Sequence, residues 1–312
     1  MILDRILDRE YAAEPSGLSR RAYGRLEAVR MAAAWSREHR RRFALVSGDV
    51  VLATARERRV MGTLNQASAQ ICGISHVFTG LRDGGAAYAE LLVERLLAVA
   101  QADGARAALL CGDMGTAWCD AAGFLRIPRT MVEVGVEQSP RHGASMTLVR
   151  AGEERDLQAI AAMGRTRATP FRLHLDRDVD TIRAAIATKR MLAGLGKSGA
   201  RELQFFIAEE GITAAAYVVL SVEGLEWTLE ECGDRDASGA RVGALLQSLI
   251  AREPAGPRPT IRGWLPPGFL PPQLAIRSTQ AAPDVVMFRS FESGGLPPLS
   301  ERDVLLWPAD LD

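Results

Sequence analysis

The stretch GLRDGGAAYAELLVERLL, residues 80–97, combines residue types that can bind an anion with the start of a helix. Its small residues, Gly84 to Ala87, let backbone N–H groups come close to a ligand. The first N–H groups of a helix lack intrahelical acceptors, and the helix dipole adds positive potential there. The pattern therefore favours a binding site for phosphate oxygens. The alternative is a tight turn that binds no ligand.

Two common nucleotide-binding patterns fit this loop poorly. The dinucleotide fingerprint requires Gly-x-Gly-x-x-Gly, whereas the glycines here are Gly80, Gly84 and Gly85. A Walker loop requires Gly-Lys-Ser/Thr, and the loop contains no lysine. If the loop binds phosphate, it belongs to a different class of site.

His76, in the segment SHVFTG before the loop, is a candidate general base. An imidazole with a pKa of about 6.5 suits proton removal at neutral pH. Strand alternation places His76 on the same, mostly apolar face as Cys72, Ile74 and Phe78. A histidine satisfied within the core is therefore the alternative.

Asp113 and Cys119 are further candidates for proton transfer, beyond the next strand. Asp113 directly follows the apolar run ARAALLCG, and its alternative role is to cap the short helix after it. A thiol has a pKa of about 8.5, which is suitable for returning a proton to a thiolate. The alternative for Cys119 is simple packing, since cysteine is often buried.

The elements around these residues follow a strand–helix–strand order. The β-rich run SAQICGISHVFTG precedes the loop, and residues 86–103 form an amphipathic helix that ends at Gly104. The run ARAALLCGD is typical of a strand buried on both faces. Upstream, a helical segment reaches about Arg40, with a basic cluster at residues 37–42 that is either a solvated helix end or a substrate-facing patch. A hairpin around Ser-Gly-Asp follows it.

The second half of the chain repeats this outline. The polar stretch EQSPRHGAS, residues 137–145, indicates a boundary between domains at 1–140 and 145–312. After it come a strand and helix in MTLVRAGEERDLQAI, a run of strands, a helix in ASGARVGALLQSLIARE, and a Gly-Phe pair in WLPPGF. Such recurrence suggests two copies of one fold.

The quoted segments resemble the Gcn5-related N-acetyltransferase (GNAT) family, and the whole chain is similar to a tandem GNAT protein. The likeness rests on SHVFTGLRDGGAAYAELL, AALLCGD and AWCDAAGF in the first half, and on LVRAGEERDLQAI and WLPPGF in the second. It implies an α+β fold of two domains, each a mixed, mostly antiparallel sheet flanked by helices.

The resemblance implies a site for acetyl-coenzyme A, or another acyl-coenzyme A, in the first half. The pantetheine arm would run along the strand at Val77, Phe78 and Thr79. The family loop, Arg/Gln-x-x-Gly-x-Gly/Ala, fits in two registers, which place Arg82, Gly85 and Ala87, or Gly84, Ala87 and Ala89, at the key positions. In both registers Ala86 and Tyr88 lie within the binding segment.

The chain departs from the family pattern at two places. Cys119 stands four residues before Gly123, where the family commonly has a tyrosine as the acid. In the second half, the loop GDRDASGARVGALL carries Asp234 and Asp236 where a pyrophosphate would bind. Because like charges repel, we expect that half to shape the structure or the substrate site rather than hold the cofactor.

Composition limits the partners. The chain has 312 residues and zero formal net charge, which argues against a nucleic-acid binder. No apolar run reaches the roughly 18 residues of a membrane span, and the N-terminus lacks a signal-peptide core, so a cytoplasmic location is expected. The four cysteines show no spacing typical of a metal site.

Together these features predict an acyl-coenzyme-A-dependent N-acyltransferase, acting on an amine of a small molecule or peptide. Two alternatives remain open. The chain is either a GNAT-derived binding or scaffold module whose site has decayed, or an enzyme that passes the acyl group to a thiol or carrier protein. The resemblance implies neither a metal nor a particular oligomeric state.

Overall fold

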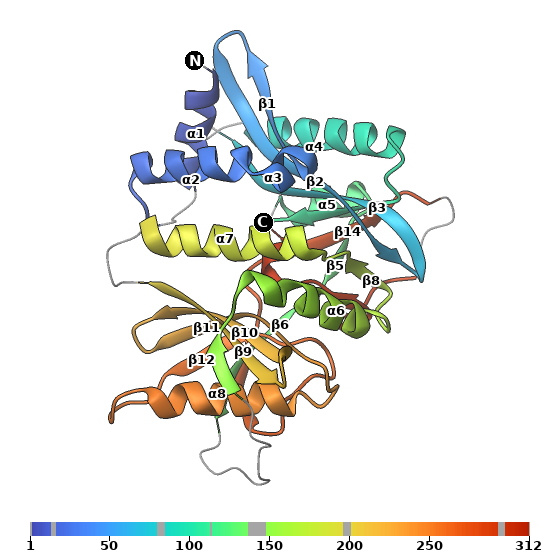
Figure 1. Ribbon diagram of the computed structural model, residues 1–312. Coiled ribbons are helices and arrows are strands. Elements are labelled where there is room, and N and C mark those ends of the chain that lie inside the picture. Colours follow the sequence, from blue (N-terminus) through green and yellow to red (C-terminus); the bar gives the residue numbers. More distant parts are fainter. Residues whose placement is uncertain are drawn as a thin grey trace.

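The computed structural model describes residues 2–13, 17–79, 85–112, 114–136, 148–195, 201–292 and 297–311. Within these residues the chain forms two mixed sheets flanked by helices (Figure 1). We refer to them as sheet A and sheet B. Both are mostly antiparallel, as the sequence predicts.

Sheet A has the strand order β15-β8-β2-β3-β4-β14-β5, with β1 also paired to β2. Its strands are β1 (Arg40–Ser47), β2 (Val50–Leu64), β3 (Ala67–Thr79), β4 (Ala107–Cys111), β5 (Leu125–Ile127), β8 (Leu173–Leu175), β14 (Val286–Ser290) and β15 (Val304–Leu305). The helices of this half are α1 (Ile2–Ala13), α2 (Arg20–Ala32), α3 (Ala34–His39), α4 (Gly85–Ala102) and α5 (Thr116–Ala121).

Sheet B has the order β13-β6-β12-β11-β10-β9-β7. Its strands are β6 (Thr130–Val136), β7 (Leu148–Ala151), β9 (Glu202–Glu210), β10 (Thr213–Glu223), β11 (Glu226–Asp234), β12 (Thr260–Trp264) and β13 (Leu274–Ala281). The helices beside it are α6 (Leu157–Ala168), α7 (Val179–Leu195) and α8 (Ala240–Arg252), and short 3-10 turns lie at Glu154–Asp156, Glu301–Asp303 and Pro308–Asp310.

The two sheets repeat one arrangement. In sheet A, β3 pairs in parallel with β4, and α4 connects these strands. In sheet B, β11 pairs in parallel with β12, and α8 connects them. Each unit is followed by a Gly-Phe pair whose glycine has φ 76°, at Gly123 and Gly268. The predicted internal repeat is therefore present in the fold.

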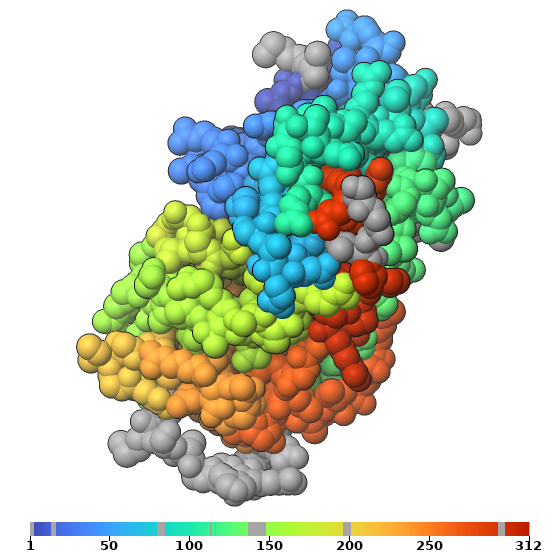
Figure 2. Space-filling model, turned by 90° about the vertical axis from the view of Figure 1, so that its right-hand side faces the viewer, coloured from blue at the N-terminus to red at the C-terminus, as the bar shows by residue number. Residues whose placement is uncertain are grey.

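The two sheets also exchange a strand. β6 inserts between β12 and β13 of sheet B, although it directly follows β5 of sheet A. In the same way β14 inserts between β4 and β5 of sheet A, although it follows β13. In Figure 2 the C-terminal segment (red) lies among segments of the first half. The predicted division at 1–140 and 145–312 falls beside undescribed residues 137–147, and neither sheet is built from one of these segments alone.

Packing of helices on the two faces of each sheet forms the cores. One face of α4 buries Leu92, Val93, Leu96 and Leu97 against β2 and β3, as its periodicity predicts. In sheet B, α8 packs on one face and α6 and α7 on the other. α7 also contacts α2 and α3, so it lies between the two halves (Figure 1). No helix among the described residues is long and apolar enough to cross a membrane.

The basic cluster at residues 37–42 is divided between a helix end and a strand: the exposed Arg37 lies in the last turn of α3, and the later arginines belong to β1. α3 ends at His39, and Arg40 begins β1. Only a tenth of the Arg42 side chain is exposed, and it forms ion pairs with Glu10 and Glu27. The interpretation of the cluster as a solvated helix end is therefore wrong for Arg42, because α1 and α2 fold back over the strand and supply two carboxylates.

Candidate functional site

β3 and β4 pair over only four residues before they part. Their parallel register runs from Ile71, opposite Ala107, to Ile74, opposite Leu110. β3 then continues to Thr79 while paired on its other side with β2. The edge of β3 that faces β4 therefore has no strand partner among the described residues after Ile74. A strand edge of this kind can pair with an extended ligand.

A β-bulge marks the point where the strands part. Thr54 lies opposite Phe78 and Arg56 opposite Ser75, so two residues of β3 face the single residue Ala55. His76 is in this bulge and has φ 52°, which is uncommon for a residue other than glycine. β11 has a bulge between Leu229 and Glu231, again just beyond its pairing with β12.

The bulge reverses the face predicted for His76. Cys72 and Ile74 pack in the core under α4, and so does Val77. Because the bulge inserts one residue, His76 lies on the opposite face, with its ring 6.1 Å from that of Phe78 in an edge-on contact. His76 is half-buried, and its Nδ1 lies 3.0 Å from Ser75 Oγ. The prediction that His76 shares a face with Cys72 and Ile74 was therefore wrong.

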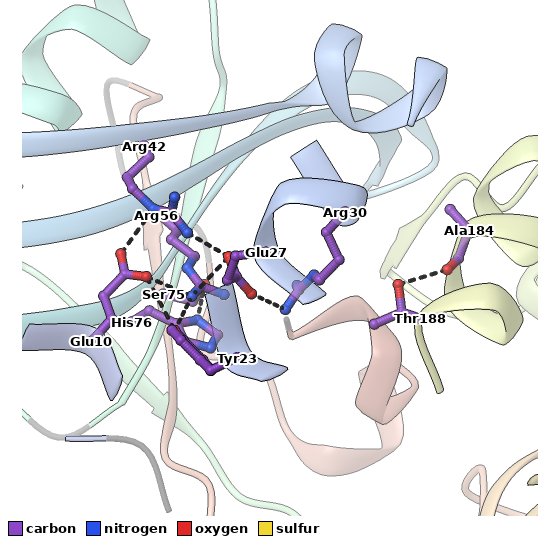
Figure 3. Close-up of polar contacts among 10 residues, drawn as sticks. All are labelled: Glu10, Tyr23, Glu27, Arg30, Arg42, Arg56, Ser75, His76, Ala184 and Thr188. Carbon is purple, nitrogen blue, oxygen red and sulfur yellow. Dashed lines mark hydrogen bonds and ion pairs between the residues drawn. The ribbon is translucent and has the colours of Figure 1, made fainter. Parts of the chain in front are cut away.

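The face that carries His76 also holds a cluster of buried charges (Figure 3). Arg56 of β2 donates to Glu10 of α1 and to the hydroxyl of Tyr23 of α2, both at 2.8 Å, and it pairs with Glu27 at 3.2 Å. Glu10 is fully buried, and Glu27 is 3% exposed. Burial acts to lower the pKa of Arg56, but Glu27 and Glu10 outweigh it and hold the pKa above the ordinary value. This network fixes α1 and α2 on the sheet next to the bulge.

α4 begins with small residues at the end of the undescribed loop. A Cβ added to Gly85 would lie 2.7 Å from Thr79 Oγ1, so only glycine lets the helix start this close to β3. Ala86 and Ala87 are exposed, Tyr88 is half-buried, and Ala89 is buried. Among the described residues, no group accepts a hydrogen bond from the amides of Ala86 and Ala87. They belong to the first helical turn, where intrahelical acceptors are missing.

The second half has a different arrangement at the equivalent place. β3 ends at Thr79 and β11 at Asp234, and in each case five residues, 80–84 or 235–239, lead to the next helix. Asp234 Oδ2 accepts hydrogen bonds from the amides of Arg241 and Val242, at 2.8 and 3.4 Å. The same carboxylate pairs with the Arg241 guanidinium at 3.2 Å. The Asp234 carboxylate thus already occupies the place at the N-terminus of α8 where a bound anion would lie.

Of the remaining predicted site residues, the structure places only Cys119, in the same core cluster as Val77 and Tyr88. Cys119 is 3% exposed and packs in the core under α4, because α5 turns that face inward. Arg82, Gly84 and Asp113 lie outside the described residues. Four neighbours of the bulge were not predicted from the sequence: Glu10, Tyr23, Glu27 and Arg56. Their helices carry several charged residues, so no spacing distinguished the two buried glutamates from solvated ones.

Comparison with solved structures identifies the fold. A GCN5-related N-acetyltransferase from Kribbella flavida superposes with a TM-score of 0.60 at 17% identity, over 86% of this chain and 64% of that protein. One from Anabaena variabilis gives 0.59 at 11% identity, over 88% and 71%. Eis1 from Mycobacterium abscessus gives 0.53 at 11% identity, over 88% and 72%. No family model and no curated protein sequence matches the chain.

The chain thus has an α+β fold in which two sheets with flanking helices repeat one unit. This is the tandem GNAT fold, as the sequence resemblance implied. The chain spans less than two thirds of the length of the Kribbella protein. At these low identities the likeness concerns the fold, and the activity is a separate question.

Proposed function

We propose that the protein is an acyltransferase that uses acetyl-coenzyme A or another acyl-coenzyme A, bound in the first half, and transfers the acyl group to an amine. The observation that carries this proposal is the contrast between the two helix starts. Asp234 occupies the amides of α8, whereas no carboxylate among the described residues accepts from the equivalent amides of Ala86 and Ala87, two residues that are exposed. Free first-turn amides are suited to a diphosphate.

The residues around the splayed strands suit the rest of the cofactor. The pantetheine arm would pair with the open edge of β3 at Val77, Phe78 and Thr79, which extends beyond the last pair with β4. In the register that begins at Arg82, the two small residues are Gly85 and Ala87. Both lie in the first turn of α4, because this helix begins at Gly85. Ala89 is buried in the helix, which favours that register over the one starting at Gly84. Bound acyl-coenzyme A would supply an activated thioester.

His76 is the proposed base for the amine. It lies at the bulge, on the face that α1 and α2 cover, and a ring nitrogen of an imidazole is a suitable acceptor for the amine proton. The Glu10–Arg56–Tyr23 network supports that face and keeps the two helices in place. Cys119 is given a packing role, since its thiol lies among apolar side chains.

Calorimetric titration with coenzyme A and acetyl-coenzyme A tests the cofactor site. We expect saturable binding to the native chain and a loss of about tenfold or more in A86P, because a hydrogen bond to a charged group contributes about 1.5–3 kcal/mol. Proline removes one amide donor yet is tolerated in a first helical turn. A86S keeps the amide and is the matched control. Failure of the native chain to bind, or equal binding by A86P, would contradict the proposal.

A thiol-release assay across small amines, peptides and carrier proteins tests the acceptor. Release that depends on an amine supports N-acyl transfer. Release only with a thiol or carrier protein favours the second alternative, and cofactor binding without release with any acceptor favours a non-catalytic module. We expect H76N to lower turnover by about 10²–10⁴-fold, as for loss of a general base, without changing coenzyme A affinity.

A further inference from the structure

The second half contains a cavity of about 430 Å³, a volume suited to a small molecule. α6 forms one wall, and the loops that follow β11 and β12 form the others. Five residues of α6 line it at positions i, i+3, i+4, i+7 and i+8, which lie on one helical face: Ala159, Ala162, Met163, Thr166 and Arg167. The two alanines leave the space that a larger side chain would fill.

Arg167 is a cation in this cavity, and no described residue pairs with it as an anion. Its guanidinium lies 3.7 Å from the centroid of the Phe269 ring, and the residue is half-buried. Within the described ranges, no group accepts a hydrogen bond from it and no carboxylate forms an ion pair with it. Burial lowers the pKa of Arg167, yet arginine stays protonated in proteins. A partly desolvated charge of this kind is favoured by an opposite charge.

The neighbouring acidic groups do not supply that charge. The Asp234 carboxylate also lines the cavity, but it is engaged by two amides of α8 and by Arg241. Burial raises the pKa of the Cys232 thiol to about 12, so the thiol is neutral. Arg235, exposed at the rim, adds a second positive charge. The cavity therefore carries a surplus of positive charge.

We propose that this cavity binds a small organic monocarboxylate, whose carboxylate pairs with the guanidinium of Arg167. The short apolar body of the ligand would lie against Ala159, Ala162 and Pro267. A diphosphate is excluded by Asp234, which holds the amides that the diphosphate would need. The second half is thus a ligand-binding unit in its own right, with a chemistry different from that of the first half.

Titration of the full chain with hexanoate, followed by NMR or calorimetry, tests the site. We expect saturable binding, with hexanamide about tenfold or more weaker, because the amide lacks the charge-assisted pair. R167Q should lose hexanoate affinity to the same extent. R262Q is the matched control, since Arg262 is exposed and pairs with Glu133 on sheet B. Equal binding of hexanoate and hexanamide, or no saturation, would overturn the proposal without requiring any variant to fold.

A second arm separates this inference from the cofactor proposal. A86P, which should weaken coenzyme A binding at α4, should leave hexanoate affinity unchanged. Coenzyme A should not displace hexanoate. If coenzyme A displaces hexanoate, and if A86P binds coenzyme A as tightly as the native chain, the cavity is the coenzyme A site and the monocarboxylate proposal fails. If coenzyme A does not bind at all while hexanoate binding depends on Arg167, only the cofactor proposal fails.

Discussion

Thr79 and Asp234 occupy equivalent positions at the ends of β3 and β11, but only Asp234 places a carboxylate on the first turn of the following helix. The Thr79 hydroxyl instead lies against Gly85, where a Cβ would be 2.7 Å from it. Two copies of one fold have therefore diverged at the helix start. In one copy the protein neutralises its own helix N-terminus, whereas in the other no carboxylate within the described ranges bonds to the amides of Ala86 and Ala87, which are exposed residues.

T79D should convert the first helix start into a copy of the second. The new carboxylate can accept hydrogen bonds from the amides of Ala86 and Ala87, as Asp234 does from Arg241 and Val242. We expect coenzyme A affinity to fall by about tenfold or more, since the anion loses donors and meets a like charge. Calorimetry measures this, with T79S as the control that should bind like the native chain. Unchanged affinity in T79D would place the diphosphate elsewhere.

G85A should destabilise the chain although alanine is the better helix former. The added Cβ would clash with Thr79, and overpacking of this kind costs about 1–3 kcal/mol. G164A is the control, since a Cβ there meets nothing within 4 Å and should stabilise α6 by about 0.5–1 kcal/mol. Urea unfolding measures both.

The same clash should be partly relieved by a second substitution. T79A removes the hydroxyl that lies 2.7 Å from the added Cβ and leaves a contact of 3.0 Å with the Cβ of residue 79. We therefore expect G85A/T79A to be less destabilised than the sum of the single variants. Simple additivity in this cycle would show that contact with the Thr79 side chain is not the cause of the destabilisation in G85A.

The sequence predicts the local order of elements well and their partners less well. The strand–helix–strand units around α4 and α8 follow from periodicity and from glycine positions, and both are present. The exchange of β6 and β14 was not predictable, because a strand has the same alternation whichever sheet it joins. The bulge at His76 also has no signature in the sequence of β3. It arises because the single residue Ala55 of β2 lies opposite two residues of β3. The sequence predicted that Asp234 and Asp236, in the loop before α8, repel a diphosphate. In the structure the Asp234 carboxylate caps α8 by accepting hydrogen bonds from its first-turn amides.

His174 should make stability depend on pH. It lines a cavity of about 460 Å³ between the two halves, and its Nδ1 has no partner among the described groups. Burial lowers the pKa of His174 below 6.5, against a smaller opposing effect of Asp176. The unfolded chain therefore takes up a proton before the folded chain does, and stability falls as pH drops from 6.5 toward the folded pKa.

H174Q removes this titration without adding a charge. We expect the urea midpoint of the native chain to fall more steeply than that of H174Q between about pH 7 and pH 5. The difference between the two curves isolates His174 from the other histidines, which titrate in both proteins. Parallel curves would mean that the imidazole charges as easily in the folded chain as in the unfolded one.

Arg177 should contribute more to stability than any exposed arginine, because it joins sheet B to the C-terminal tail. It pairs with Glu231 of β11 and with Asp310, and Glu231 also accepts a hydrogen bond of 2.6 Å from the hydroxyl of Tyr217. The backbone carbonyl of Asp310 accepts a hydrogen bond from Arg58 of β2, so the same cluster reaches sheet A.

The substitution R177A would leave two buried carboxylates without their cation, and we expect the free energy of unfolding to fall by about 3–5 kcal/mol. R183A is the matched control: Arg183 pairs with Glu154 and Asp180 at the surface, where such a pair contributes at most about 1 kcal/mol. Urea unfolding of both variants should show a large loss for R177A and a small one for R183A. Similar losses would mean that the tail and sheet B are held together by apolar contacts, such as that between Trp307 and Trp264, rather than by Arg177.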